Sequence, residues 1–143
     1  MVLYYTATSR ESAHIIEQQS KNVIAKKESS IDAMHLLKEQ AQMMKEALLM
    51  GKLNQFGEVL DYGYQQKRKM AEGISNPLME EIYETAKKAG ATGGKISGAG
   101  GGGFMIFYCP YNTKFAVIKS LEKFGGQYKS FQFVEHGLKT WTI

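Results

Sequence analysis

A glycine-rich stretch constrains this chain more than any other part of its sequence. Residues 95–103 read KISGAGGGG, so five of nine positions are glycine, and the apolar run Phe104–Cys109 follows directly. Glycine costs conformational entropy and has no side chain to pack, so such a run indicates positive φ angles or a close approach to another body. Successive N–H groups in such a loop can bind an anion, commonly a phosphate. The stretch therefore predicts an anion- or ligand-binding loop, with a flexible turn between two strands as the alternative.

Two better-known glycine motifs fit this stretch poorly. Residues 98–103 match the dinucleotide pattern G-x-G-x-x-G, but that pattern needs a helix after the glycines, and Phe104–Cys109 is typical of a strand. The phosphate loop of nucleotide triphosphatases needs Ser or Thr after its lysine, whereas Ile96 follows Lys95. A strand–loop–strand arrangement remains.

Composition excludes several classes of protein. With 143 residues the chain is long enough for one domain with a proper core, spanning 1–143. The net charge is +4 and the lysines are dispersed, which argues against nucleic acid as a partner. The single Cys109 excludes a disulfide framework and fits the cytoplasm, and three scattered histidines make no recognisable metal site. We find no signal peptide or membrane span.

Periodicity and turn signals predict a layered α+β domain. We expect strands over 2–6, near 95–96, and over 104–109, 128–135 and 139–143, and helices over about 9–25, 30–50, 53–70, 77–89 and 113–124. Asn76-Pro77 is a helix start signal, and Gly51 and Gly90 stand at helix ends. The simplest packing is a ferredoxin-like layered domain, with a small antiparallel sheet and helices on one face.

Apolar stripes indicate which helix faces point inward. In the second helix the stripe steps by three and four residues, and we expect it to be core: Ile31, Met34, Leu37, Ala41, Met44 and Leu48. In the fifth helix we expect Phe115, Ile118, Leu121 and Phe124 to face inward.

The turn after the first strand is a second candidate site. Thr8 and Glu11 fit a capping box, so two hydroxyls and Arg10 stand close to exposed helix N–H groups. Such a turn can bind a phosphate or sugar hydroxyls. A capped helix with a surface arginine explains the same residues equally well.

Several motifs, in the same order along the chain, resemble the GHMP kinases. Residues 95–103 resemble the third, C-terminal motif of that family. Residues 5–10 (YTATSR) resemble the entry motif of its sugar-kinase branch, with Ala7 where that branch commonly has Gly. The runs 73–77 (GISNP), 82–83, 88–91 and 93–95 resemble the heptose kinases of that branch. The resemblance covers essentially the whole chain.

The resemblance implies half of an enzyme. GHMP kinases have two domains, and the N-terminal domain supplies the main ATP-phosphate loop and the acidic residue that acts as base or metal ligand; this chain contains neither. We therefore expect a C-terminal, substrate-binding domain, inactive alone, with an N-terminal GHMP kinase domain as its partner. The complete enzyme is expected to use ATP and Mg²⁺ to phosphorylate a sugar phosphate. The resemblance to the heptose kinases implies that the acceptor is the anomeric hydroxyl of a heptose 7-phosphate. We expect no catalytic or metal-binding residue, and no tightly bound cofactor, in this chain; homodimerisation stays open.

The resemblance also gives roles to particular residues. The wall beside the transferring phosphate is expected to consist of Ser97, Gly98, Ala99, Gly100, Gly101 and Gly102, acting through backbone N–H groups and the serine hydroxyl. Arg10, with Thr8 and Ser9, is expected to bind the sugar or its distal phosphate. Lys67 is a lesser candidate for that anion, since a solvated lysine explains it more simply, and Lys95 is a weaker candidate at the loop.

Three other functions remain open. A fucose- or galactose-type sugar kinase is the alternative within the family. A non-catalytic ferredoxin-like module that binds a small ligand would bind it without a second domain. A nucleic-acid-binding α+β domain would need a clustered basic face and strongly salt-dependent binding.

Overall fold

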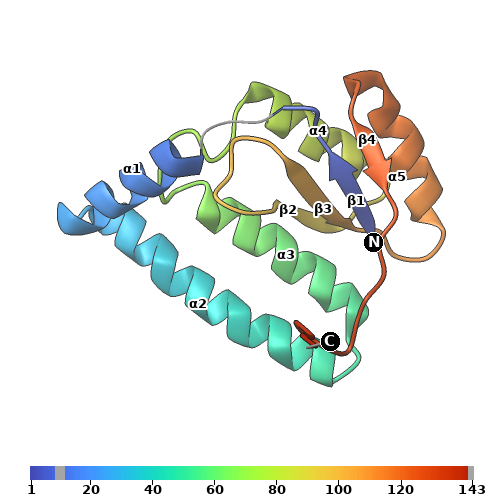
Figure 1. The fold of residues 1–143 in the computed structure, drawn as a ribbon, viewed down its shortest axis with the longest axis horizontal. Helices are drawn as coiled ribbons and strands as arrows, with labels where there is room; N and C mark the ends of the chain where they lie inside the picture. Colours follow the sequence, from blue (N-terminus) through green and yellow to red (C-terminus); the bar gives the residue numbers. More distant parts are fainter. Residues whose placement is uncertain (9–11, 142–143) are drawn as a thin grey trace.

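A computed structural model describes residues 1–8 and 12–141 of the chain. Its sheet has four strands, all paired antiparallel, in the order β2-β3-β1-β4 (Figure 1). Their bounds are β1 (Val2–Tyr5), β2 (Gly93–Ile96), β3 (Phe104–Tyr108) and β4 (Gln127–Lys129). This strand order is the ferredoxin-like one, so the predicted α+β class and antiparallel sheet are confirmed.

The helices are distributed unevenly between the strands. Four of them separate β1 from β2, and one helix with a short 3₁₀ turn separates β3 from β4. Their bounds are α1 (Ser12–Ile24), α2 (Glu28–Leu49), α3 (Leu53–Lys67), α4 (Pro77–Lys88), α5 (Thr113–Leu121) and η1 (Glu122–Phe124). In Figure 1, α1, α2 and α3 lie to one side of the sheet, whereas α4 and α5 lie next to the strands and away from α2.

Local signals place the helix ends where the sequence predicts them. The Asn76 side chain accepts a hydrogen bond from the Met79 N–H at 3.0 Å, and Pro77 is the first residue of α4. Gly51 follows α2 with φ +66°, and Gly90 follows α4 with φ +112°. These angles favour glycine, which explains why both helices end there.

The main core lies between one face of the sheet and helices α4 and α5. Alternate strand residues such as Tyr4, Met105 and Phe107 are buried against Ile82 of α4 and Leu121 of α5. Burying each of these large side chains contributes about 1.5–3 kcal/mol. Tyr64, on α3, and Cys109, which follows β3, belong to the same cluster.

Helix α3 approaches the edge strand β2 more closely than side chains would allow. A Cβ on Gly57 would collide with the hydroxyl of Thr92, the residue before β2, and a Cβ on Gly93 would collide with the backbone of Gly57. Glycine at both positions therefore permits the contact between helix and strand. Among the described residues, no helix combines the length and apolar character needed to cross a membrane.

The predicted core stripe of α2 is wrong. Met34 is 42% exposed and Leu48 is 52% exposed, while Ile31, Leu37 and Met44 are only half-buried and Ala41 is exposed. The buried positions of α2 are instead the small residues Ser30, Ala33 and Ala47. Helix α2 packs mainly against α3, where Gln40 lies over Gly63, and this close contact selects small residues rather than the longest apolar ones.

The inner face predicted for α5 is partly wrong. Leu121 is buried and Ile118 and Phe124 pack against the core, but Phe115 is 77% exposed and Val117 takes the buried position instead.

The two C-terminal strands predicted over 128–135 and 139–143 are also wrong. Only Gln127–Lys129 forms a strand, and residues 130–141 have no regular secondary structure; 142 and 143 lie outside the described residues. The register explains this, because Lys129 pairs with Leu3 and β1 ends one residue further on, at Val2. Among the described residues, β1 offers β4 no strand residue beyond Val2 to pair with.

Candidate functional site

The glycine stretch forms the loop between β2 and β3. All five glycines have positive φ: +82° at Gly98, +126° at Gly100, +77° at Gly101, +154° at Gly102 and +82° at Gly103. The backbone conformation that the sequence predicted is therefore present. A strand, β3, follows the loop directly, which confirms that it is not a dinucleotide-binding turn.

One side of the loop is held by the segment before α4. The Gly101 N–H donates to the Ile74 carbonyl at 2.8 Å, and the Asn76 side-chain amide donates to the Gly101 carbonyl at 3.3 Å. A Cβ on Gly100 would lie 2.6 Å from the Ile74 carbonyl oxygen. Ala99 packs against a small apolar cluster that includes Ile15 of α1 and Ile74. The loop backbone is thus fixed directly against residue 74.

The other side of the loop is held by the turn after β1. The Gly103 N–H donates to the Thr8 carbonyl at 2.8 Å, and the Thr6 N–H and hydroxyl donate to the Gly103 carbonyl at 2.8 and 3.0 Å. A Cβ on Gly102 would lie 2.8 Å from the Thr8 carbonyl oxygen. The hydroxyls of Thr6 and Thr8 lie 2.9 Å apart. The two stretches that the sequence singled out, around Thr8 and over 97–102, therefore lie side by side.

The loop keeps several N–H groups unused. Within residues 1–8 and 12–141, the N–H groups of Gly98, Ala99, Gly100 and Gly102 donate to no protein acceptor. The Gly101 N–H already donates to the Ile74 carbonyl, so it does not serve as the anion donor that the sequence predicts. The Ser97 N–H is occupied by Phe104 at 2.8 Å, which leaves its exposed hydroxyl. A row of unused amides is suited to binding an anion.

Lys67 lies at this loop rather than in solvent. It is the last residue of α3, is half-buried, and donates a hydrogen bond from Nζ to the Gly98 carbonyl. Burial, and secondarily the charge of Lys95, lowers the pKa of Lys67. The structure thus brings a cation to the predicted anion loop from a distant part of the sequence.

The remaining predicted residues lie outside the described part of the chain. Ser9, Arg10 and Glu11 fall in this gap, so the capping box and the predicted grip of Arg10 on a substrate stay predictions. Thr8 is half-buried, and the preceding Ala7 has φ +55°, a left-handed conformation. That angle agrees with a position where glycine is the favoured residue.

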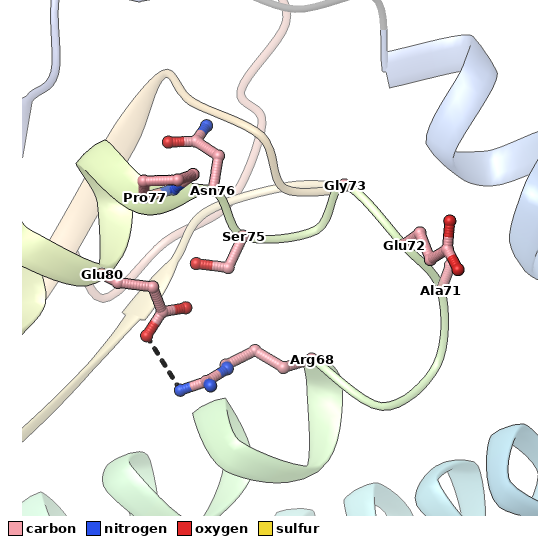
Figure 2. Close-up of a pocket in the computed structure, with 8 residues that line it drawn as sticks. All are labelled: Arg68, Ala71, Glu72, Gly73, Ser75, Asn76, Pro77 and Glu80. Carbon is pink, nitrogen blue, oxygen red and sulfur yellow. Dashed lines mark ion pairs between the residues drawn. The ribbon is translucent and has the colours of Figure 1, made fainter.

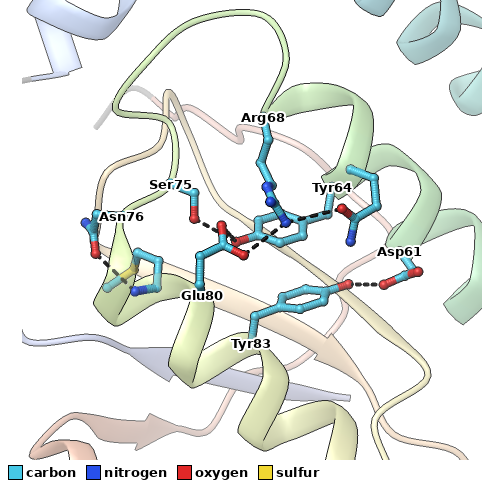
Figure 3. Close-up of polar contacts among 9 residues, drawn as sticks. Asp61, Tyr64, Arg68, Ser75, Asn76, Glu80 and Tyr83 are labelled. Atoms are coloured by element: carbon cyan, nitrogen blue, oxygen red, sulfur yellow. Dashed lines mark hydrogen bonds and ion pairs between the residues drawn. The ribbon is translucent and has the colours of Figure 1, made fainter.

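Sequence reasoning missed a polar network behind the loop. The Tyr64 and Ser75 hydroxyls lie 2.9 Å apart, and the Tyr83 hydroxyl donates to Asp61 at 2.6 Å (Figure 3). Burial raises the pKa of both tyrosines, that of Tyr64 to about 12. The two rings stack at 4.1 Å between centroids. The spacing of Asp61, Tyr64 and Arg68 on one helix face was the available signal.

A hollow of about 420 Å³ lies in front of this network (Figure 2). Its one cation, Arg68, forms an ion pair at 2.9 Å with Glu80, one of the two carboxylates that line it. The lining residues come from the end of α3, the following loop and the start of α4: Arg68, Ala71, Glu72, Gly73, Ser75, Asn76, Pro77 and Glu80. The described residues contain no group of three or more His, Cys, Asp or Glu side chains that could hold a metal.

Comparison with known proteins identifies the family. The family model "GHMP kinases C terminal" matches residues 44–127, more than half of the chain. This chain is a GHMP kinase C-terminal domain. The resemblance inferred from the glycine loop and its neighbouring motifs is therefore confirmed.

Relatives of this GHMP kinase C-terminal domain are longer proteins. The D-glycero-alpha-D-manno-heptose 7-phosphate kinase of Campylobacter jejuni is 39% identical over 142 residues, which cover 99% of this chain and 41% of that protein. The chain thus spans about two fifths of the length of this curated relative.

Solved structures share the fold. A putative sugar kinase from Campylobacter jejuni has a TM-score of 0.64 at 36% identity, over 99% of this chain and 38% of that one. The mevalonate kinase of L. major, solved with R-mevalonate, has a TM-score of 0.78 at 22% identity, over 85% of this chain and 37% of that one.

Proposed function

We propose that this GHMP kinase C-terminal domain is the substrate-binding half of an ATP-dependent sugar kinase. The complete enzyme transfers the γ-phosphoryl group of ATP to the anomeric hydroxyl of a heptose 7-phosphate. The 39% identity to a heptose 7-phosphate kinase supports the substrate class. The observation that carries the proposal is the loop over 97–103, with five positive φ angles and a row of N–H groups that find no acceptor within residues 1–8 and 12–141.

Phosphoryl transfer depends mainly on positioning and on stabilising negative charge, and the loop is suited to both. The N–H groups of Gly98, Ala99, Gly100 and Gly102 form the wall beside the transferring phosphate, and the Ser97 hydroxyl adds a donor. Gly101 acts indirectly, since its N–H holds the loop against Ile74. The loop is fixed before a substrate arrives, so its dipoles need little reorganisation during the reaction.

The turn after β1 and the end of α3 supply the substrate contacts. Thr8, Ser9 and Arg10 bind the sugar or its distal phosphate, and a guanidinium can contact two phosphate oxygens at once. Lys67 is placed at the same loop by its hydrogen bond to Gly98. Thr8 and Lys67 come from distant parts of the sequence and both contact the loop.

The second wall of the cleft belongs to an N-terminal GHMP kinase domain. The C. jejuni relative is more than twice as long as this chain, which supports a partner domain of that kind. The unused amides fit phosphate groups of ATP, whereas the Mg²⁺ ligands and the catalytic base are assigned to the N-terminal domain. The protein is assigned to the cytoplasm, where the one buried thiol, Cys109, stays reduced.

A chimaeric enzyme tests the proposal. This chain replaces the matching part of the C. jejuni heptose kinase, and ATP consumption is measured with heptose 7-phosphate, fucose and galactose. We expect turnover with heptose 7-phosphate, and none from this chain alone or from the remaining part of the relative alone. Preference for fucose or galactose selects the alternative sugar-kinase assignment.

Two results would contradict the proposal. One is a chimaera that unfolds cooperatively, as a folded protein does, but consumes no ATP with any sugar. The other is sugar-dependent turnover by the 143 residues alone. Tight binding of a small metabolite by the isolated chain, without chimaera activity, would favour the non-catalytic binding module.

A further inference from the structure

Two lysines stand at the same corner of the glycine loop. Lys67 ends α3 and donates to the Gly98 carbonyl, and Figure 1 shows the β2–β3 loop reaching toward this end of the helix. Lys95 lies in β2, three residues before Gly98, and is exposed. Its neighbour across the sheet is Ile106, on the face opposite the buried Met105 and Phe107. The charge of Lys95 contributes, after burial, to the lowered pKa of Lys67.

Within the described residues, no carboxylate compensates these two charges. The ion pairs there join Lys21 to Glu17, Arg68 to Glu80, Lys87 to Asp61 and Lys123 to Glu81, and neither Lys67 nor Lys95 takes part in one. Arg68, the next residue after Lys67, has its carboxylate at 2.9 Å.

Burial and a nearby cation both disfavour the charged form of Lys67, and a bound anion would offset both effects. The simplest alternative is a lysine that stabilises the C-terminal end of α3 and tethers the loop. That role accounts for the hydrogen bond to Gly98. It does not account for the position of Lys95, which adds repulsion.

The unused donors lie at this corner too. The N–H groups of Gly98, Ala99 and Gly100 lie next to the Gly98 carbonyl in the chain, and they have no acceptor among residues 1–8 and 12–141. Two cations and a row of amides therefore meet over a few residues, which is the donor set that recognises a phosphate-type dianion.

We propose that Lys67 and Lys95 form a subsite for a phosphate group at the Gly98 corner of the loop. The inference rests on the proposed function and deepens it, because it makes a second, non-reacting phosphate part of the recognised substrate or donor. The phosphate comes either from a phosphorylated sugar or from a nucleotide. On binding, Lys67 exchanges its hydrogen bond to the Gly98 carbonyl for one to a phosphate oxygen.

Anion titration of the 143-residue chain tests this subsite. Backbone amide resonances of residues 97–103 are followed by NMR at fixed ionic strength with three probes: inorganic phosphate, mannose 6-phosphate and ATP. We expect saturable shifts in the loop, weakened about tenfold in Lys67→Gln and several-fold in Lys95→Gln. Lys67→Arg keeps the charge and is expected to retain most of the binding. Lys88→Gln, which removes an exposed lysine at the far end of α4, is the matched control and is expected to bind as the wild type does.

The probes identify the source of the phosphate. Lysine-dependent binding of mannose 6-phosphate but not of ATP assigns the subsite to the sugar, and the reverse assigns it to the nucleotide. Loop shifts that are equal in the wild type and in the Lys67→Gln/Lys95→Gln double variant overturn the subsite, as does a wild-type loop that no probe shifts. Turnover by the chimaera is measured separately, so the kinase assignment stands or falls independently of these titrations.

Discussion

Replacing Gly100 by alanine tests whether the loop is held as tightly as its geometry indicates. A Cβ at this position would lie 2.6 Å from the carbonyl oxygen and 2.8 Å from the Cα of Ile74, and both are backbone atoms that cannot rotate away. The native φ of +126° is also one that L-residues rarely adopt. The loop must therefore shift, and the hydrogen bond from Gly101 to Ile74 is lost with it.

Three terms set the size of the expected destabilisation. Strain at a sparsely populated φ costs about 1–3 kcal/mol. The lost hydrogen bond adds about 1 kcal/mol. The reduced entropy of the unfolded alanine chain returns about 0.4–1 kcal/mol. We expect a net loss of about 2 kcal/mol of unfolding free energy, which lowers Tm by roughly 7 °C for a domain of this size.

Gly98→Ala is the matched control. Gly98 also has positive φ, at +82°, but a Cβ there would meet no atom within 4 Å. The Gly98→Ala substitution is therefore expected to destabilise the domain only through the unfavourable φ angle, by about 1 kcal/mol. Urea unfolding followed by circular dichroism measures both variants, with unchanged m-values as the check on two-state behaviour. Equal destabilisation by the two substitutions would refute the packing argument, because it would leave no cost for the contact with Ile74.

Two further substitutions probe other parts of the site. Ala7→Gly relieves a left-handed residue with φ +55°, so we expect about 1 kcal/mol of stabilisation in thermal unfolding, and a lower Tm would contradict the strain. Tyr64→Phe is expected to change how the stability of the domain depends on pH. Burial raises the pKa of Tyr64 from 10.0 to about 12, so its contribution to stability is present below pH 10 and is lost as the pH rises toward 12. The variant is expected to lose less Tm than the wild type between pH 9 and pH 11, and an equal loss would mean that Tyr64 ionises freely.

Features set by local backbone chemistry could be predicted from the sequence. Asn76-Pro77 combines a favoured N-cap residue with a favoured first helical residue, and Gly51 marks a helix end because few residues adopt its φ. The glycine loop belongs to this class as well, since five positive φ angles leave little choice of residue. Its position between two strands followed from the apolar run behind it.

Features that depend on a distant partner could not be predicted. The inner face of α2 is set by Gly63 on the neighbouring helix, which admits small residues and leaves Met34 outside. The strand after Lys129 stops because β1 is short, which its own β-prone residues do not reveal. The place of Lys67 at the loop is of this kind, because nothing near it in sequence indicates that the end of α3 meets Gly98.

The central position of β1 has a consequence for how the chain folds during synthesis. Val2 pairs with Phe107 and Leu3 with Lys129, so β1 has no pairing partner until residues 104–108 have been synthesised, and its second partner follows only at 127–129. The four intervening helices can form early, but the sheet waits for its most distant pairings, which slows folding. An N-terminal strand left unpaired for that long exposes a β-prone edge, and chaperones or a domain folded ahead of it would protect the nascent chain.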